Sequence, residues 1–301
     1  IMSNADVVKI DVGKVISDRL PMLSRFMPGR LIKWLEGLIR QTELNDLLEA
    51  NAGKTGAEFC RGVLKYLGIT IKVRFPERLP SQENRRVLFI SNHPLGGLDG
   101  MALIDMIHRY YGGQVWFVVN DLLMAVKPLE NVFLPINKFG SQQRQSAVRI
   151  EEAFEGNDPI IIFPAGLVSR YRRFPFEGED KKMVADLEWR KTFVNKCIRY
   201  KRDIVPLFFS GTNSMDFYRK ANLRKRLGIK FNLEMMLLPR EMLDTKGKTF
   251  VVTVGNLHRW DTLEGGRDAQ GSANSLAYET YLLSRESGDV HDLPPVEDTR
   301  L

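Results

Sequence analysis

The spacing of apolar residues changes once along the chain, near Ile69. Before that point apolar residues recur at helical spacing, with Arg and Lys between them, over Leu20 to Leu48 and again over Gly56 to Leu67. This pattern predicts an N-terminal amphipathic helical segment, residues 1–69. The segment has two interpretations: a helical cap packed on the core, or an interfacial hairpin with Trp34 at the level of lipid headgroups.

After Ile69, short β-branched and aromatic runs alternate with longer helical patterns. Strands are expected at Thr70 to Phe75, Val87 to Ser91, Val115 to Val119, Val132 to Ile136, Ile160 to Phe163, Ile204 to Phe209, Asn232 to Leu238 and Thr249 to Val254. Helices are expected at Met101 to Tyr111, Asp121 to Val126, Gln142 to Glu155 and Glu188 to Tyr200. The alternation is typical of an α/β fold, a mostly parallel central sheet flanked by helices, over residues 70–264. In such sheets ligands bind at the carboxyl ends of the strands.

The remaining residues, 265–301, are predicted to form a C-terminal helix and a polar tail that is loosely held. The chain shows no internal repeat and no low-complexity stretch. No stretch reaches the roughly 18 uninterrupted apolar residues that cross a bilayer. We therefore expect one large core and a chain that does not span a membrane by itself.

The amino-acid composition indicates what kind of partner the protein binds. The 301 residues include 44 Lys or Arg and 37 Asp or Glu, a formal net charge of +7. This balance favours an anionic partner: nucleic acid, a phospholipid surface, or an acidic or phosphorylated substrate. The two cysteines, Cys60 and Cys197, lie far apart and no apolar leader precedes them, so we expect a reduced, cytoplasmic compartment.

Candidate chemistry first appears in the loop after the second predicted strand. Asn92 and His93 are followed by Gly96 and Gly97, and then by Asp99 at the start of a helical pattern. A histidine with an acid folded back onto it can act as a general base, since the carboxylate fixes the tautomer and stabilises the imidazolium. The glycines permit a tight path and leave backbone N–H groups free to approach a ligand. Asp99 has an alternative role as the N-cap of the helix that follows.

No nucleophile of the protein's own accompanies His93. The sequence has no Gly-x-Ser-x-Gly elbow, and both cysteines fall in predicted amphipathic helices. The four histidines are scattered, without the His or Cys cluster of a metal site, and His108 and His291 are given no role. The sequence therefore predicts a base that activates a nucleophile of the substrate, with no metal.

Two further loops carry groups that suit an anion. The first follows Ile160 to Phe163, turns at a glycine, and presents Gly166, Ser169, Arg170, Arg172 and Arg173. The second follows Val132 to Ile136 and presents Lys138, Ser141 and Arg144, the last two at a helix start. Backbone amides, hydroxyls and guanidinium groups of this kind can hold a phosphate or a carboxylate. For the first loop the alternative is a solvated basic loop.

Together, four segments resemble the signature blocks of the glycerolipid acyltransferases, the lysophosphatidate and glycerol-phosphate acyltransferase superfamily, over roughly Val73 to Asn256. The matching residues are Asn92-His93 with Asp99, Ile136-Asn137-Lys138, Phe163-Pro164-Ala165-Gly166 with Ser169, and Val205-Pro206. The first and third segments are most similar to a bacterial subgroup labelled hemolysins. Some members of that subgroup are implicated in making acylated amino-acid lipids such as ornithine and glycine lipids.

Three positions depart from the family pattern. Five residues separate His93 from Asp99 where the family usually has four, so the loop must bulge. Ala165 stands where the third block usually has Glu, and Lys138 where the second usually ends in Arg. The first of these changes removes a carboxylate, and Lys cannot make the bidentate fork of Arg. The departures suggest an acceptor other than plain glycerol phosphate.

The resemblance implies transfer of a fatty acyl group from acyl carrier protein or coenzyme A to the hydroxyl of a lyso-lipid, either a lyso-phospholipid or a mono-acylated amino-acid lipid. His93 would deprotonate the hydroxyl and Asp99 would orient the imidazole. Backbone amides would donate to the oxyanion of the tetrahedral intermediate, with candidates near Gly96, Gly97 and Gly166. The substrate-binding candidates are Lys138, Arg144, Gly166, Ser169 and Arg170.

Beyond the acyl donor, we expect no cofactor and no nucleic-acid partner. A basic stretch could rest on anionic lipid, dock an acidic carrier protein, or be an ordinary charged helix face; its cations are Arg219, Lys220, Arg224, Lys225 and Arg226. The expected location is cytoplasmic, peripheral on the inner face of the membrane. The competing hypothesis is a non-catalytic membrane- or lipid-binding protein, as the hemolysin label implies.

Overall fold

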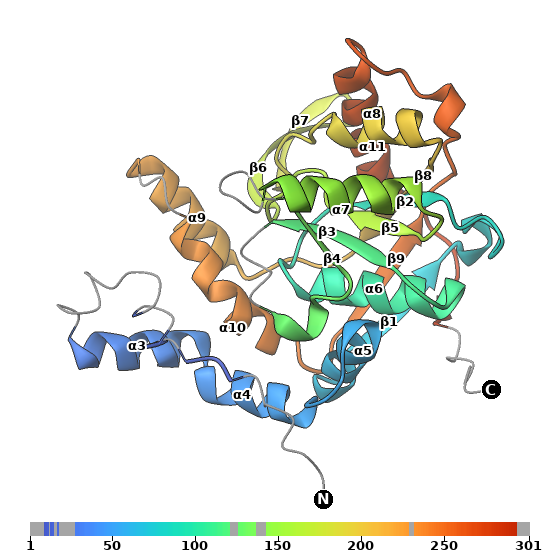
Figure 1. The fold of residues 1–301 in the computed structure, drawn as a ribbon. Helices are drawn as coiled ribbons and strands as arrows, with labels where there is room; N and C mark the ends of the chain where they lie inside the picture. The colour runs from blue at the N-terminus through green and yellow to red at the C-terminus, as the bar shows by residue number, and fades with distance from the viewer. Residues whose placement is uncertain are drawn as a thin grey trace, which may run out of the picture.

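The computed structural model describes residues 9–11, 13, 14, 17, 28–120, 126–136, 143–228 and 232–293. An eight-stranded sheet lies at its centre, in the order β10-β1-β9-β8-β2-β5-β3-β4 (Figure 1). The pairings are parallel except those of β1 with β10 and of β8 with β9. The predicted α/β fold with a mostly parallel central sheet is confirmed.

Most elements lie where the apolar pattern predicts them. The central strands are β1 (Thr70–Arg74), β2 (Val87–Ser91), β3 (Trp116–Asn120), β4 (Phe133–Ile136), β5 (Ile160–Ile162), β8 (Asp203–Phe209), β9 (Thr249–Val254) and β10 (Val290–Asp292). A separate hairpin consists of β6 (Arg170–Phe176) and β7 (Glu179–Ala185). The helices are α3 (Gly29–Ile39), α4 (Gln41–Ala50), α5 (Gly56–Tyr66), α6 (Leu98–Tyr111), α7 (Gln143–Glu155), α8 (Thr192–Tyr200), α9 (Met215–Arg226), α10 (Leu238–Leu243) and α11 (Ala269–Leu282).

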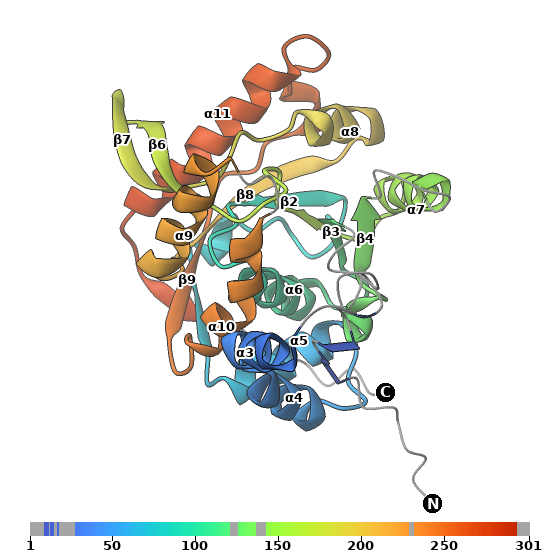
Figure 2. The same cartoon turned by 90° about the vertical axis from the view of Figure 1, so that its left-hand side faces the viewer.

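Helices cover both faces of the sheet (Figures 1 and 2). Helix α6, with α5 against it, lies on one face, and α7, α8 and α11 lie on the other. The central strand β2 serves both layers, because Phe89 packs in the first cluster while Leu88 and Ile90 pack in the second. All of β2 is buried. Its carboxyl end, where the loop with His93 begins, is therefore fixed between two packed layers.

The strand predicted at Asn232 to Leu238 is wrong. The segment forms a 3-10 helix, η4 (Leu233–Leu237), which runs into α10. Its Leu, Met and Glu residues favour helix, it contains no β-branched residue, and Pro239 stands in the first turn of α10, where proline is tolerated. The predicted helix at Asp121 to Val126 falls almost wholly outside the described residues.

The expected C-terminal helix corresponds to α11 (Ala269–Leu282), but residues 269–292 are not loosely held. Helix α11 buries Ala273 and Leu276 in the second cluster, and β10 pairs with β1 at the edge of the sheet. Arg170, Arg172 and Arg173, expected in a loop, lie instead on strand β6 of the hairpin β6–β7, which stands beside α11 (Figure 2).

Helix α5 packs on α6 through buried Phe59 and Val63, as a cap on the core would. Helix α3 instead leaves Leu31 and Trp34 exposed. In the described part of the chain, no helix is long and apolar enough to cross a membrane. The division into segments 1–69, 70–264 and 265–301 stays a prediction.

Candidate active site

Asn92 fixes the start of the loop that carries His93. Its side-chain amide accepts a hydrogen bond from the N–H of Phe209 at 2.7 Å and donates one to the carbonyl of Phe209 at 3.0 Å. The amide thereby continues the pairing of β2 with β8 by one more rung after Ser91. The loop consequently leaves the carboxyl edge of the sheet from a fixed point, which is where ligands bind in this class of fold.

His93 and Asp99 meet. Nδ1 of His93 lies 2.9 Å from Oδ2 of Asp99, and the same oxygen accepts the N–H of Leu95 at 2.9 Å. The longer loop closes this distance by turning at Gly96, whose φ is +86°. Asp99 lies in the first turn of α6, after an N-cap at Gly97, so the alternative N-cap role of Asp99 does not hold.

The electrostatics keep Asp99 ionised. Burial alone would raise the pKa of this fully buried carboxyl, but the charge of His93 and hydrogen bonds from His93, Leu95 and Gly100 outweigh burial and lower the pKa below its ordinary value. An ionised Asp99 accepts a hydrogen bond from Nδ1–H, which assigns the proton of a neutral imidazole to Nδ1 and leaves the lone pair on Nε2.

The imidazole ring of His93 is bonded at its edge by Asp99 and is also packed against an aromatic ring on its face. It stacks on Phe163 with 4.0 Å between ring centroids and 16° between planes. The side chain is 10% exposed, against 0% for Asp99. His93 therefore has the surroundings of an oriented base: an apolar wall, a buried carboxylate and limited access from outside.

A second carboxylate, Asp186, holds the main chain of His93. Its Oδ1 accepts the N–H of His93 at 3.1 Å and the hydroxyl of Ser169 at 2.5 Å. The N–H of Ser169 in turn donates to the carbonyl of His93 at 2.8 Å. Sequence reasoning missed Asp186, because only the hairpin β6–β7 returns it to His93 and that hairpin was not predicted.

The structure brings Ser169 and Arg170 to the site, but their polar groups turn inward. The hydroxyl of Ser169 bonds Asp186, and the guanidinium of Arg170 donates to Glu234 at 2.8 Å. Arg224, from the basic stretch on α9, also pairs with Glu234 at 2.8 Å. This buried group joins β6, α9 and η4, so the residues that the sequence assigned to an anion hold neighbouring elements together here.

The other predicted site residues are placed differently. Arg144 is exposed in the first turn of α7, and Gly166 takes the turn after β5 with φ of +68°. Lys138 and Ser141 lie outside the described residues. The N–H of Gly96 faces Asp99 at 3.4 Å, whereas Gly97 stands at the amino end of α6, where N–H groups point out of the helix. Gly97 is thus the better placed of the two oxyanion candidates.

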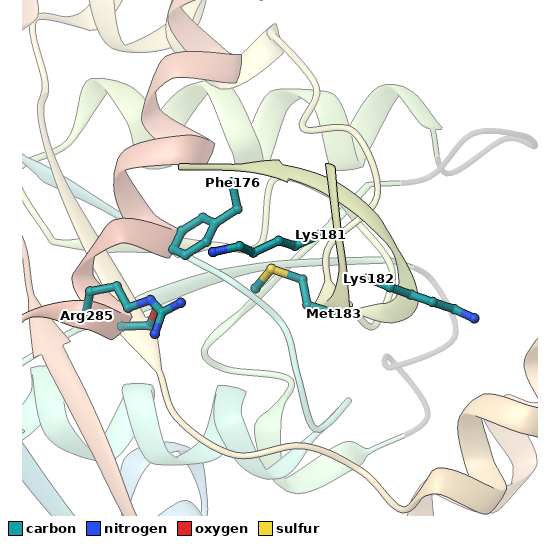
Figure 3. A pocket seen from close by; sticks show the side chains of 6 residues that line it. Phe176, Lys181, Lys182, Met183 and Arg285 are labelled. Carbon is teal, nitrogen blue, oxygen red and sulfur yellow. The ribbon is translucent and has the colours of Figure 1, made fainter. Parts of the chain in front are cut away.

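A hollow of about 360 Å³ lies under the turn of β6–β7 (Figure 3), lined by Phe176, Lys181, Lys182, Met183, Ser284 and Arg285. Glu177 pairs with two of its cations, Lys181 at 2.9 Å and Arg285 at 3.5 Å. The residues that line the hollow include none of His93, Asp99, Ser169 and Asp186. The hollow is therefore separate from the candidate site.

Other nucleophiles and metal ligands do not gather at the site. Cys60 and Cys197 are buried, and burial raises the pKa of both thiols. His108 lies within α6 and His291 in β10. Among the described residues, no group of three or more His, Cys, Asp or Glu could hold a metal ion. Neither cysteine has the lowered pKa of an activated thiol.

Comparison with known proteins identifies the class of chemistry. A family model described as Acyltransferase matches residues 14–290. The chain belongs to this acyltransferase family. The resemblance inferred from the motifs is confirmed, and the protein is an enzyme of the acyltransferase type.

Two curated relatives of this acyltransferase carry the same name, lyso-glycine lipid O-acyltransferase. The one from Phocaeicola vulgatus is 40% identical over 263 residues, 87% of this chain and 91% of the relative. The one from Bacteroides thetaiotaomicron is 38% identical over 282 residues, 94% of this chain and all of the relative. A crystal structure of a 1-acyl-sn-glycerophosphate acyltransferase from Thermotoga maritima aligns over 90% of each chain, with a TM-score of 0.45 and 11% identity.

Proposed function

We propose that this acyltransferase moves a fatty acyl group from a thioester, on acyl carrier protein or coenzyme A, to the hydroxyl of a mono-acylated glycine lipid. The names of the two relatives, which match over most of their length, support this acceptor. The observation that carries the proposal is the contact between His93 and the buried Asp99, 2.9 Å between Nδ1 and Oδ2. That contact suits a base that activates a hydroxyl of the substrate.

In the proposed reaction, Nε2 of His93 takes the proton of the acceptor hydroxyl as its oxygen attacks the thioester carbonyl. Asp99 stabilises the imidazolium that forms. The carbonyl oxygen becomes an oxyanion, for which the N–H groups at Gly97 and the amino end of α6 are the candidate donors. As the carbon–sulfur bond breaks, the imidazolium returns its proton to the departing thiolate. The products are an ester and a free thiol, and the chemistry uses no resident cofactor.

The anionic headgroup of the acceptor needs a cation. Arg144 is exposed at the start of α7, and Lys138 follows β4 in the matching family block. We assign the headgroup to these two residues, since Arg170 is already paired with Glu234.

We also propose that the enzyme works as a peripheral protein on the inner face of the membrane. Helix α3 exposes Leu31 and Trp34, and α9 exposes Leu223 and Leu227 near a basic last turn. Apolar side chains beside Arg and Lys suit the surface of an anionic bilayer. In flotation assays, vesicles that contain anionic lipid should bind the enzyme more strongly than neutral vesicles, and added salt should weaken that binding.

The test is a matrix of donors and acceptors with purified enzyme. Long-chain acyl carrier protein and acyl coenzyme A are each offered with mono-acylated glycine, mono-acylated ornithine and lysophosphatidate, and mass spectrometry follows the acylated lipid. We expect the glycine acceptor to give the largest kcat/KM. His93→Ala should abolish the product while circular dichroism and the melting temperature stay those of a folded protein. Full activity of this variant would remove His93 as the base, and vesicle lysis that the variant preserves would favour a membrane-damaging protein instead.

A further inference from the structure

The residues just before and just after the hairpin β6–β7 bond each other and the main chain of His93. In the hairpin register Arg170 pairs with Ala185, so Ser169 and Asp186 flank the last paired position. Their side chains close the base of the hairpin through the bond from Ser169 Oγ to Asp186 Oδ1, 2.5 Å. Both residues are 1% exposed. The base of the hairpin is thus a buried hydrogen-bonded unit that excludes water.

This unit holds both main-chain polar groups of one residue. The N–H of His93 donates to Asp186 Oδ1 at 3.1 Å, and the carbonyl of His93 accepts from the N–H of Ser169 at 2.8 Å. Asp186 bonds the main-chain N–H of His93, whereas Asp99 and Phe163 hold the ring. The Cα of His93 and its imidazole are therefore fixed by separate sets of groups.

Asp186 is itself fixed on every side. Oδ2 accepts the indole N–H of Trp189 at 2.9 Å, and the N–H of Asp186 donates to the hydroxyl of Tyr281 at 2.7 Å. Burial raises the pKa of this carboxyl, since an ionised group is poorly solvated there. A buried charge is weak evidence for a contribution to stability, because well-packed apolar groups often do as well. The carboxylate has a use that no apolar side chain could serve, which is to accept the N–H of His93.

We propose that Asp186, acting with Ser169, is a positioning residue for His93: its carboxylate holds the main chain so that Nε2 points at the acceptor hydroxyl. The proposal rests on the proposed function of His93 as the general base. Its effect is on the step in which the proton moves, so its removal lowers kcat more than it changes KM.

The test compares two variants that disturb the contact with one that does not. Asp186→Asn has a single acceptor oxygen, so either orientation of its amide sets an N–H group against a donor. Ser169→Ala keeps the carboxylate and the bond from its own N–H to His93, and removes only the hydroxyl. The control, Thr245→Val, removes a buried hydroxyl whose bond is to the carbonyl of Met242, and leaves every hydrogen bond of Asp186 in place.

We expect Asp186→Asn to lower kcat about 100-fold, because small displacements of a reacting group have effects of that order. Ser169→Ala should lower kcat about tenfold, the usual effect of one hydrogen bond to a charged group. Thr245→Val should lower the melting temperature and leave kcat near the wild-type value. If Asp186→Asn kept the wild-type kcat, or lost no more than Thr245→Val, the proposal would be overturned.

A second readout does not depend on turnover. In protein labelled with 15N in the histidine rings, the proton on Nδ1 that His93 shares with Asp99 should give a resonance that is absent from His93→Ala. Asp186→Asn and Ser169→Ala should shift or broaden it, and Thr245→Val should not. Failure of the wild type to acylate any acceptor would overturn the proposed function, while this resonance still decides the role of Asp186. An unmoved resonance in Asp186→Asn would overturn the positioning role even in an active enzyme.

Discussion

The side chain of Asn92 bonds Phe209 as a neighbouring strand would, accepting from its N–H at 2.7 Å and donating to its carbonyl at 3.0 Å. Asn92 is 3% exposed. Only an amide of this length offers one acceptor and one donor side by side. The residue before His93 thereby ties the loop to β8, and the loop depends on the exact chemistry of that side chain.

Asn92→Asp tests this dependence, because it replaces the donor with an oxygen that faces the carbonyl of Phe209. We expect the free energy of unfolding to fall by about 2–3 kcal/mol, the cost of leaving buried polar groups unpaired. Urea unfolding at neutral pH measures the change. The matched control is Asn274→Asp on the exposed side of α11, which should change stability little. Equal stability of the two variants would contradict the pairing.

Asp99→Asn should show whether Asp99 orients the imidazole of His93, the proposed base, or only supports the fold. The amide can present an N–H to Nδ1 of His93, which favours the wrong tautomer, so kcat should fall by roughly 1,000-fold or more while the protein stays folded. The measurement is kcat under saturating donor and acceptor, with near-ultraviolet circular dichroism as the check on packing. A loss below tenfold would mean that Asp99 does not orient the base.

The acid stability of the enzyme should also depend on Asp99. Its pKa is lower in the folded protein than in the unfolded chain, so the folded state binds fewer protons and this contribution to stability is present above the ordinary Asp pKa of about 3.9. The contribution is lost as the pH falls through the folded pKa. We expect the stability gap between wild type and Asp99→Asn to narrow on acidification from about pH 7 to about pH 3. Urea unfolding at each pH measures the gap, and a constant gap would contradict the assignment.

Gly96 and Gly97 form a matched pair for the shape of the loop. Gly96 has φ of +86°, and a Cβ there would lie 2.7 Å from a methyl carbon of Leu238 and 2.9 Å from one of Val168. Gly97 has φ of −173°, and a Cβ there would meet nothing within 4 Å. We expect Gly96→Ala to cost about 2–4 kcal/mol of unfolding free energy, from strain and overpacking together. Gly97→Ala should cost far less, and thermal melts of both variants would show whether the difference exists.

Arg202 stabilises the end of α7. Its fully buried guanidinium donates to the carbonyls of Ala153, Phe154, Gly156 and Asp158, at 2.6–2.9 Å. Burial and the nearby Arg86 lower its pKa to about 10, so it stays charged at neutral pH, opposite the negative end of the helix.

Arg202→Met should lower the free energy of unfolding by about 3 kcal/mol or more, since several buried carbonyls lose their donor. Chemical denaturation measures the loss. Arg173→Met, at a side chain 73% exposed on β6, is the control and should be nearly neutral. A small loss in Arg202→Met would show that water or other donors reach those carbonyls.

The middle strands of the sheet could be predicted from sequence because they are buried on both faces, whereas the exposed edge strand β10 was not predicted. Such strands form continuous apolar runs, and β2 and β5 are of this kind. The hairpin β6–β7 could not be predicted in this way, since β6 carries three arginines and Pro175 and has little apolar alternation. The strand predicted around Glu234 was wrong although the segment is apolar, because a short apolar run can belong to a buried helix as well as to a strand.

The contacts of the site differ in the same way: a local sequence pattern could predict some of them and not others. His93 and Asp99 lie six positions apart, so a local motif was enough to pair them. Asp186 lies 93 positions from His93, and no local pattern reports a contact that depends on how an unpredicted hairpin folds back. The inward turn of Arg170 was equally hidden, because its partner Glu234 comes from a segment whose structure was misjudged.

Because Ser169 and Asp186 bond each other, the chain between them leaves the body of the enzyme and returns to the same point. The turn at Glu177 and Gly178 lies at the other end of the paired register, where Glu177 contacts Tyr278 and Arg285 and not the loop of His93. Residues could be inserted or exchanged at that turn, and a fluorophore, an affinity tag or a second domain could be carried there, without altering the path of the chain through the site. The acyltransferase therefore offers an attachment point on a hairpin that is bonded to the loop of His93 at its base and has its turn away from that loop.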